Sequence, residues 1–326
     1  MKNNFNNILV IQTAFIGDAI LASSVIEKLH HHFQNASISL LVRKGNEGLY
    51  TQHPFLKEVL IWNKTEGKYS SLFKLKNQIN KNKYDAVINL HRYASSGFLT
   101  AFSGARFKAG FDKNPFSFLF SKKVKHVIGD GRHETERYSE LIKDITDEKV
   151  FRPKLYPSPT DLAKVEAYKK GKYVCMSPSS VWFTKQLPEE KWIELINQLP
   201  SDVTVYLLGG KGDLEACERI KVKDKRLKTQ VLAGELNLLQ SAALMKDAQM
   251  NYVNDSAPLH LASATNAPVT AFFCSTVPAF GFTPLSDNSK IVEVKNLECR
   301  PCGLHGFKAC PKGHFKCGFD MDVKGQ

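Results

Sequence analysis

Short runs of apolar residues alternate with stretches of helical spacing along most of this 326-residue chain. Residues 8–12 (ILVIQ) are too apolar for a half-exposed strand, so they predict a strand buried on both faces. Residues 37–42 (SISLLV) and 85–90 (DAVINL) predict two further strands. Residues 18–33 space their apolar side chains as one face of a helix does. This alternation predicts an α/β fold of right-handed βαβ units, in which helices cover both faces of a parallel sheet.

The alternation stops at three prolines in residues 152–160 (RPKLYPSPT) and then begins again. Further strands are predicted at 58–62, 172–176, 203–208, 229–232, 249–253 and 269–273, and helices at 70–82, 160–170, 188–198, 212–221, 237–247 and 257–265. We therefore expect two parallel-sheet domains, over residues 1–155 and 156–326, each long enough for its own core. Ligands of such domains bind outside the carboxyl ends of the strands.

The formal charge of +13 favours an anionic partner, which could be nucleic acid, an acidic membrane surface or a phosphorylated substrate. The basic residues form no nucleic-acid motif, so a nucleic-acid partner is not expected. No apolar stretch reaches the ~20 residues that cross a bilayer. The N-terminus superficially resembles a signal peptide, but it contains Asp18 and lacks a persuasive cleavage site. We interpret it as a buried strand of a cytoplasmic protein.

The turn after the first strand contains Gly17 and Asp18. Neither a G-x-G-x-x-G fingerprint nor a P-loop follows this strand, which argues against hydride transfer and P-loop phosphoryl transfer. Gly17 would allow close backbone approach. Asp18 has two interpretations: a general base for an acceptor hydroxyl, or a helix-start carboxylate stabilised by the helix dipole.

The segment NDSAPLH, residues 254–260, predicts an anion site in the second half. We expect Ser256 to cap a helix and Pro258 to lie in its first turn. Free amide groups and the helix dipole at such a start attract anions, with His260 close by. Diphosphate is the natural candidate.

Two other loops in the second half could bind a nucleotide. In residues 177–185 (SPSSVWFTK), hydroxyls and amides can donate to phosphate, and Lys185 can neutralise a leaving group without a metal. The glycine-rich turn LLGGKGD, residues 207–213, allows close approach. Asp213 or Glu215 could accept from ribose hydroxyls, or simply stabilise a helix start.

Four cysteines crowd the end of the chain, at Cys299, Cys302, Cys310 and Cys317. All four thiolates could form a structural zinc site, with His305 and His314 as alternative ligands. The spacing does not match a paired CxxC ribbon, so the alternative is a compact, loop-rich segment with reduced thiols.

Taken together, IGDAI, SPSSVWFTKQLP, LLGGKGD, LAGELNLLQSAAL and NDSAPLHLASATNAPV resemble the heptosyltransferases of glycosyltransferase family 9. The cysteine tail is similar to that of the lipopolysaccharide heptosyltransferase II branch. The resemblance implies a GT-B fold, two Rossmann-like domains facing each other across a cleft. It also implies inverting, metal-independent transfer of heptose from ADP-heptose to the lipopolysaccharide inner core, with no required cofactor.

The same resemblance assigns roles to individual residues. Asp18 matches the catalytic base, and Lys185 matches the lysine that binds the diphosphate. The donor-binding loop matches Asp255, Ser256, Ala257 and His260, with Ser-Ala where Thr-Gly is usual. Positions lining the nucleotide pocket match Ser180 and Leu236, and Asp213 is the candidate acidic nucleotide contact. The basic excess suits an acceptor with lipid phosphates and acidic sugars at the inner face of a membrane.

Two alternatives stay open at the level of sequence. The same fold could use another nucleotide sugar or another glycan acceptor, since sugar contacts come from loops that spacing does not decode. A non-catalytic module that binds a sugar nucleotide or lipid A would carry the same loops without turnover.

Overall fold

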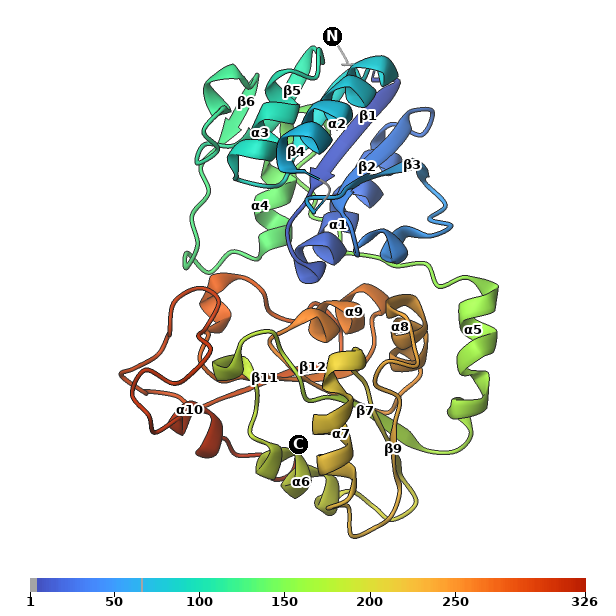
Figure 1. Cartoon of the computed structure of the whole chain (residues 1–326), viewed down its shortest axis with the longest axis vertical. Helices are drawn as coiled ribbons and strands as arrows, with labels where there is room; N and C mark the ends of the chain where they lie inside the picture. The colour runs from blue at the N-terminus through green and yellow to red at the C-terminus, as the bar shows by residue number, and fades with distance from the viewer. Residues whose placement is uncertain (1–4, 66) are drawn as a thin grey trace. The chain divides into compact units, whose positions relative to one another are not determined.

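The computed structural model describes residues 5–65 and 67–326, and the chain divides into two compact units (Figure 1). The first unit extends to Ile128 and resumes over Arg132–Tyr156. The second holds Gly129–Gly131 and Pro157–Gln326. Each unit contains one six-stranded sheet whose strands pair in parallel. The predicted α/β class with two Rossmann-like parallel-sheet units is therefore confirmed.

The first sheet has the strand order β3-β2-β1-β4-β5-β6. Its strands are β1 (Asn7–Gln12), β2 (Ser37–Arg43), β3 (Leu56–Trp62), β4 (Ala86–Asn89), β5 (Phe107–Phe111) and β6 (Lys122–Val124). The order of connection reverses at β1, which pairs with β2 on one side and β4 on the other. Such a switch point leaves a crevice at the carboxyl ends of the two strands, where open α/β sheets bind ligands.

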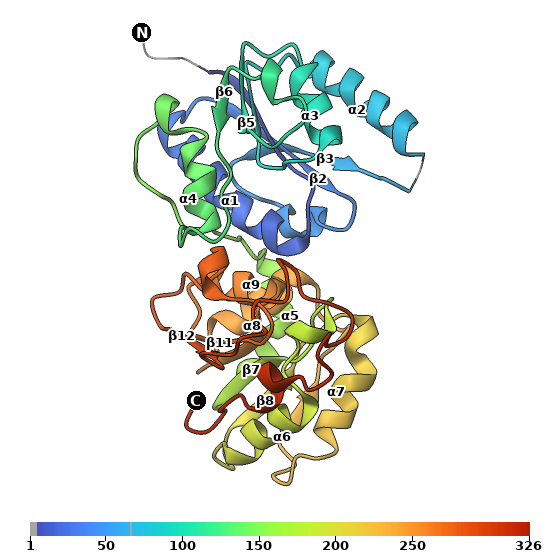
Figure 2. The ribbon, with the colours of Figure 1, turned by 90° about the vertical axis from the view of Figure 1, so that its left-hand side faces the viewer.

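Helices cover both faces of this sheet. They are α1 (Ile16–His32), α2 (Lys68–Asn82), α3 (Ala94–Ala101) and α4 (Glu134–Glu140), with 3₁₀ turns η1 (Glu47–Tyr50), η2 (Ser117–Leu119) and η3 (Lys143–Ile145). Figure 2 shows α2 and α3 on one side of the sheet, and α1 and α4 on the other. Leu9 and Ile11 of β1 share a buried cluster with Leu75 and Ile79 of α2. One apolar face of α2 thus packs against alternate residues of β1, as the 3.6-residue period of a helix and the two-residue period of a strand require.

The second sheet has the order β12-β11-β10-β7-β8-β9. Its strands are β7 (Tyr173–Ser177), β8 (Thr204–Leu207), β9 (Thr229–Val231), β10 (Asn251–Asn254), β11 (Val269–Phe273) and β12 (Ser289–Glu293). The helices are α5 (Pro159–Val165), α6 (Glu189–Gln198), α7 (Leu214–Lys221), α8 (Leu238–Lys246), α9 (Ala257–Thr265) and α10 (Lys316–Phe319), with 3₁₀ turns η4 (Glu166–Lys169), η5 (Phe183–Lys185), η6 (Lys211–Asp213) and η7 (Pro278–Phe280). The helix predicted at 160–170 ends at Val165 and continues as η4.

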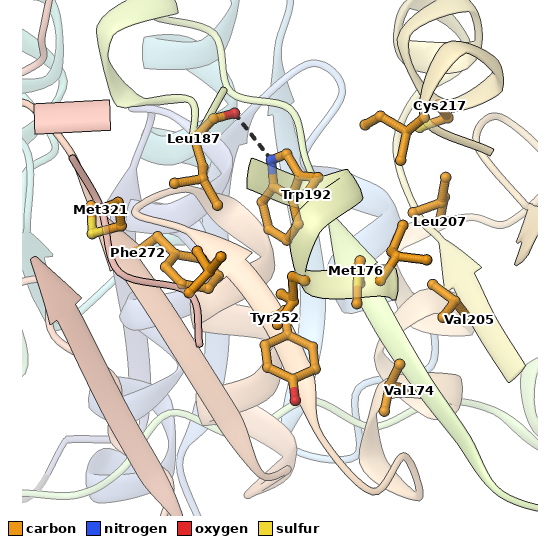
Figure 3. Packing of buried hydrophobic residues seen from close by; sticks show 14 of the residues in the cluster. Val174, Met176, Leu187, Trp192, Val205, Leu207, Cys217, Tyr252, Phe272 and Met321 are labelled. Atoms are coloured by element: carbon orange, nitrogen blue, oxygen red, sulfur yellow. Dashed lines mark hydrogen bonds between the residues drawn. The ribbon is translucent and has the colours of Figure 1, made fainter. Parts of the chain in front are cut away.

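The core of the second unit is built around Trp192 of α6 (Figure 3). Its indole Nε1 donates to the carbonyl of Leu187 at 3.1 Å, and its ring meets the edge of Phe272 at 5.4 Å. Cys317 and Met321 of the tail belong to the same cluster. The cysteine-rich end is therefore packed into the fold of this unit. In the described part of the chain, every helix is too short or too polar to cross a membrane.

Candidate functional site

The loops singled out in the second half meet at one edge of the second sheet. Strand β7 pairs in parallel with both β8 and β10, so the carboxyl ends of all three strands lie side by side. The loop that carries Lys185 follows β7, the glycine-rich turn follows β8, and Asp255 follows β10. This edge is where a nucleotide-binding α/β unit receives its ligand.

Lys185 and Asp255 form a buried ion pair at this edge. The Lys185 Nζ lies 2.8 Å from Asp255 Oδ2, and these side chains are 16% and 8% exposed. The hydroxyl of Thr276 donates to the same carboxylate oxygen at 2.6 Å. An ammonium has three N–H donors in one compact charge, so a lysine fixed in this way can also donate to phosphate oxygens of a ligand.

The helix start after β10 differs in one respect from the prediction. Ser256 makes no capping hydrogen bond, so the predicted cap is wrong. Its backbone is extended (φ −153°, ψ −177°), and its hydroxyl points back toward the carbonyl of Asn254 at 3.5 Å. Pro258 lies in the first turn as predicted, Ala257 is half-buried, and His260 is buried near the ring of Phe282. The first-turn amides are thus not bonded to the Ser256 side chain.

A single carboxamide fixes the loop after β7. Asn254 Oδ1 accepts from the amide of Leu187 at 2.9 Å, and its Nδ2 donates to the carbonyl of Pro178 at 2.8 Å. Gln186 Nε2 also donates to the carbonyl of Ser180 at 2.6 Å. Because Asn254 directly precedes Asp255, the residue that holds both ends of the loop also positions the carboxylate that meets Lys185.

The cysteine-rich tail packs directly against this loop, which the sequence did not reveal. The amide of Thr184 donates to the carbonyl of Phe307 at 3.1 Å, and the amide of Phe307 donates to Thr184 Oγ1 at 2.8 Å. Gly306 has φ +77°, and a Cβ there would lie 2.8 Å from Thr184 Oγ1 and 3.2 Å from Lys185 Cγ. Only glycine fits this close approach.

The four tail cysteines border one small cavity. Cys299, Cys302, Cys310 and Cys317 line a space of about 260 Å³ together with His314. Burial, and then the neighbouring thiols, raise the pKa of Cys302, and burial chiefly raises that of Cys317 to about 12. Among the described residues, no three His, Cys, Asp or Glu side chains are placed to hold a metal ion. The zinc site stays a prediction, to be tested by the metal content of the purified protein.

Asp213 has a local structural role in the glycine-rich turn. Its Oδ2 accepts from the amide of Gly210 at 2.8 Å and so closes the turn at η6. The turn after β9 packs on η6, since a Cβ on Gly234 would lie 2.9 Å from Lys211 Cγ. Leu236, two residues later, is half-buried. The nucleotide contacts of Asp213 and Leu236 stay predictions.

In the first unit, Asp18 lies in the first turn of α1 and is half-buried. The buried Tyr138 of α4 faces it: burial, then the charges of Glu134 and Asp18, raise the pKa of this phenol. Gln12, the last residue of β1, donates to the Tyr138 hydroxyl at 2.8 Å. The Asp18 carboxylate therefore stands at the carboxyl end of β1, beside the switch point of the sheet.

Several basic residues at the same edge were not singled out from the sequence. His91 follows β4, and its Nδ1 lies 3.0 Å from Thr13 Oγ1, while Lys64 after β3 donates to the Thr13 carbonyl at 3.3 Å. Arg43 ends β2 and Arg92 follows β4. The sequence offered one clue to these residues: each basic side chain lies directly at or after the end of a predicted strand. Cations that converge on one edge suit an anionic ligand.

The buried His53 and the half-buried His91 make the first unit sensitive to acid. Burial lowers the pKa of His91 to about 4, helped by the charges of Lys64 and Arg92, and lowers that of His53 to about 4, helped by His30. Below the ordinary histidine pKa, protons therefore bind the unfolded chain more strongly than the folded one. Stability is complete above about pH 6.5 and falls as the pH drops toward 4.

At pH 5 we expect each histidine to lower the free energy of unfolding by on the order of 2 kcal/mol relative to pH 7. Urea unfolding at both pH values measures this difference. The variants His53→Gln and His91→Gln should each show a smaller loss than the parent, and the exposed His31→Gln should not. Equal losses in all four proteins would contradict the expectation.

A family model described as glycosyltransferase family 9 (heptosyltransferase) matches residues 72–308. Lipopolysaccharide heptosyltransferase 1 of Pseudomonas aeruginosa is 22% identical to this chain over 320 residues, which cover 90% of this chain and 85% of the relative.

Two solved structures share the fold. The family 9 glycosyltransferase of Veillonella parvula superposes with a TM-score of 0.80 at 19% identity, covering 89% of this chain and 86% of the relative. The ADP-heptose lipopolysaccharide heptosyltransferase II of Escherichia coli superposes with a TM-score of 0.78 at 21% identity, covering 90% and 92%. These matches confirm the predicted GT-B fold.

Proposed function

Since the chain belongs to glycosyltransferase family 9, we propose that it transfers heptose from ADP-heptose to the inner core of lipopolysaccharide. The observation that carries this proposal is the ion pair of Lys185 and Asp255 beside the uncapped start of α9. A buried cation next to helix-start amides suits a diphosphate. The solved Escherichia coli relative is itself an ADP-heptose lipopolysaccharide heptosyltransferase.

The donor's ADP binds the second unit in this proposal. Its diphosphate faces Lys185 and the segment from Ser256 to His260, while Ser180, Asp213 and Leu236 contact the nucleoside. Negative charge grows on the leaving ADP as the glycosidic bond breaks. The Lys185 ammonium and the α9 amides stabilise that charge in the way a metal ion would, so the reaction needs neither a metal nor a cofactor.

The acceptor sugar binds the first unit, and Asp18 takes the proton from its hydroxyl. The oxygen attacks the anomeric carbon from the face opposite the diphosphate, through a transition state with oxocarbenium character. The bond to the diphosphate breaks on the other face, so the anomeric configuration inverts. Domain closure around the bound donor would exclude water and limit hydrolysis.

An anionic, lipid-anchored acceptor explains the basic strand ends of the first unit. Arg43, Lys64 and Arg92 stand at the edge that carries Asp18. They suit the phosphates and acidic sugars of a lipopolysaccharide core. Such an acceptor lies in the cytoplasmic face of the inner membrane during synthesis, so we place the enzyme in the cytoplasm with peripheral contact to that surface.

The direct test is to incubate the purified protein with ADP-heptose and a heptose-deficient lipopolysaccharide core. We expect a mass increase of one heptose, unchanged by a chelator. Turnover with UDP- or GDP-sugars in place of ADP-heptose would show a different donor. Tight donor binding without turnover on any core acceptor would show a binding module and contradict the proposal.

A further inference from the structure

Aromatic side chains gather on the outer side of α2 and α3 in the first unit. The rings of Phe73 and Phe98 lie 5.7 Å apart, those of Phe98 and Phe102 5.0 Å, and those of Phe102 and Phe116 6.2 Å. Both helices lie next to each other along the same side of the sheet (Figure 2). Phe118 of η2 follows Phe116 by two residues and is exposed. We call these five phenylalanines the aromatic surface.

Much of the aromatic surface is open to solvent. Phe73 is 55% exposed, Phe102 44% and Phe118 71%. The inward side of α2 is already filled by its own apolar residues, Leu72, Leu75 and Ile79. Of the five phenylalanines, Phe98 packs partly against this core, whereas Phe73, Phe102 and Phe118 are exposed. Soluble monomers rarely leave such a contiguous apolar patch in water, and patches of this kind mark binding surfaces.

The charge around the aromatic surface is strongly positive. Residues 67–119, which include all five phenylalanines, contain nine lysines and arginines and two acidic residues, Asp85 and Asp112. The Asp85 carboxylate accepts from the amides of Asn6 and Asn7, and so is engaged by the backbone. Lys74 of α2 and Lys113, just before the loop of Phe116, are exposed. Aromatic rings rimmed by lysines match the headgroup region of an anionic bilayer, which takes rings into its boundary and attracts cations.

The aromatic surface is fixed to the strand-end edge of the first unit. Asn114 Nδ2 donates to the carbonyls of His91 and Tyr93 at 3.2 and 3.0 Å. Gly97 of α3 lets this loop approach closely, because a Cβ there would lie 1.8 Å from Asn114 Oδ1. The loop that presents Phe116 and the segment that carries His91 therefore form one rigid piece.

We propose that the aromatic surface docks this protein on an anionic phospholipid bilayer, with its phenylalanines in the headgroup boundary and its lysines against lipid phosphates. The choice of a membrane as partner rests on the proposed function, since a lipid-anchored acceptor must reach the strand-end edge that the same rigid piece carries. The docking itself needs neither donor nor acceptor.

The test is flotation of the protein with vesicles of phosphatidylglycerol and phosphatidylethanolamine, and with vesicles of phosphatidylcholine alone. We expect the parent protein to bind the anionic vesicles and to be released by salt. The variant Phe73→Ser/Phe118→Ser should lose about tenfold or more in affinity, since binding scales with buried apolar area. Lys74→Gln/Lys113→Gln should lose roughly 30-fold in affinity.

Matched controls come from the second unit. Val222→Ser/Phe319→Ser removes two exposed apolar side chains, and Lys223→Gln/Lys225→Gln removes two exposed lysines. Both should bind vesicles as the parent does. Failure of the parent to bind, or equal binding by the phenylalanine variant, would overturn the proposal. A third outcome would also overturn it: a parent protein that is dimeric and does not bind vesicles, and that becomes monomeric in the phenylalanine variant. The aromatic surface would then join two copies of this chain.

Transfer assays separate this proposal from the proposed function. With a water-soluble, deacylated acceptor, the phenylalanine variant should transfer heptose as fast as the parent. With acceptor embedded in vesicles, it should be slower by about the loss in vesicle affinity. Transfer without vesicle binding would overturn only the docking surface, and vesicle binding without transfer would overturn only the proposed function.

Discussion

Replacing Asp18 with asparagine is expected to lower kcat for heptosyl transfer by about 10²- to 10⁴-fold, the usual contribution of a general base. The amide keeps the shape of the side chain but cannot take the acceptor proton. The KM for ADP-heptose should stay close to that of the parent, because the proposed donor contacts all lie in the second unit. Steady-state kinetics with the heptose-deficient core acceptor measure both parameters.

A structural role for Asp18 predicts different behaviour. If the carboxylate only stabilises the start of α1, Asp18→Asn should lower stability slightly and leave kcat and its pH profile intact. Glu190→Gln is the matched control, since Glu190 is an exposed acid in the first turn of α6. A general base also makes kcat fall at low pH, where the base is protonated, and Asp18→Asn should remove this fall. Near-normal transfer by a well-folded Asp18→Asn protein would make the assignment wrong.

Replacing Lys185 with methionine is expected to lower kcat/KM for the donor by about 10²- to 10³-fold, comparable to the loss of one preorganised group that stabilises a developing anion. The substitution also leaves the buried Asp255 carboxylate without its cation. Breaking a buried pair in this way destabilises a protein by about 3–5 kcal/mol. Urea unfolding must therefore accompany the kinetics.

The double variant Lys185→Met/Asp255→Asn separates the two effects. It removes both charges, and the asparagine oxygen can still accept from Thr276, so most of the lost stability should return. Transfer should not return, because the diphosphate still lacks its cation. Recovery of transfer together with stability would mean that Lys185 acts only by supporting the fold, and the diphosphate role would be lost.

Strands with unbroken apolar runs could be predicted from the sequence, whereas β5, β6 and β12 could not. β5 (FKAGF) is interrupted by a lysine and a glycine, yet Gly110 is required there, since a Cβ would lie 2.5 Å from the ring of Phe120. β12 is mostly exposed and lacks the pattern of a buried strand. α4 is capped by His133, whose ring accepts from the amide of Thr135. Histidine is not among the usual capping residues, so this start gave no signal.

Part of the candidate site could likewise be predicted from the sequence, and part could not. Lys185 and Asp255 could be located because they follow apolar strands, and parallel strands bring their ends to one edge. The capping role of Ser256 was wrong, since its hydroxyl points to the carbonyl of Asn254 and makes no capping hydrogen bond to the helix. Thr276 was missed because its contact with Asp255 joins residues 21 positions apart in the sequence. Only the folded sheet brings that pair together.

The contact between Thr184 and Phe307 limits how the loop that carries Lys185 can be exchanged for that of a relative. The loop that carries Lys185 takes part of its backbone pairing from the tail, and Gly306 leaves no room for a side chain between them. The loop and the tail therefore depend on each other structurally, although Thr184 and Phe307 are 123 positions apart in the sequence. A chimera that exchanges donor loops between relatives should carry the matching tail with it.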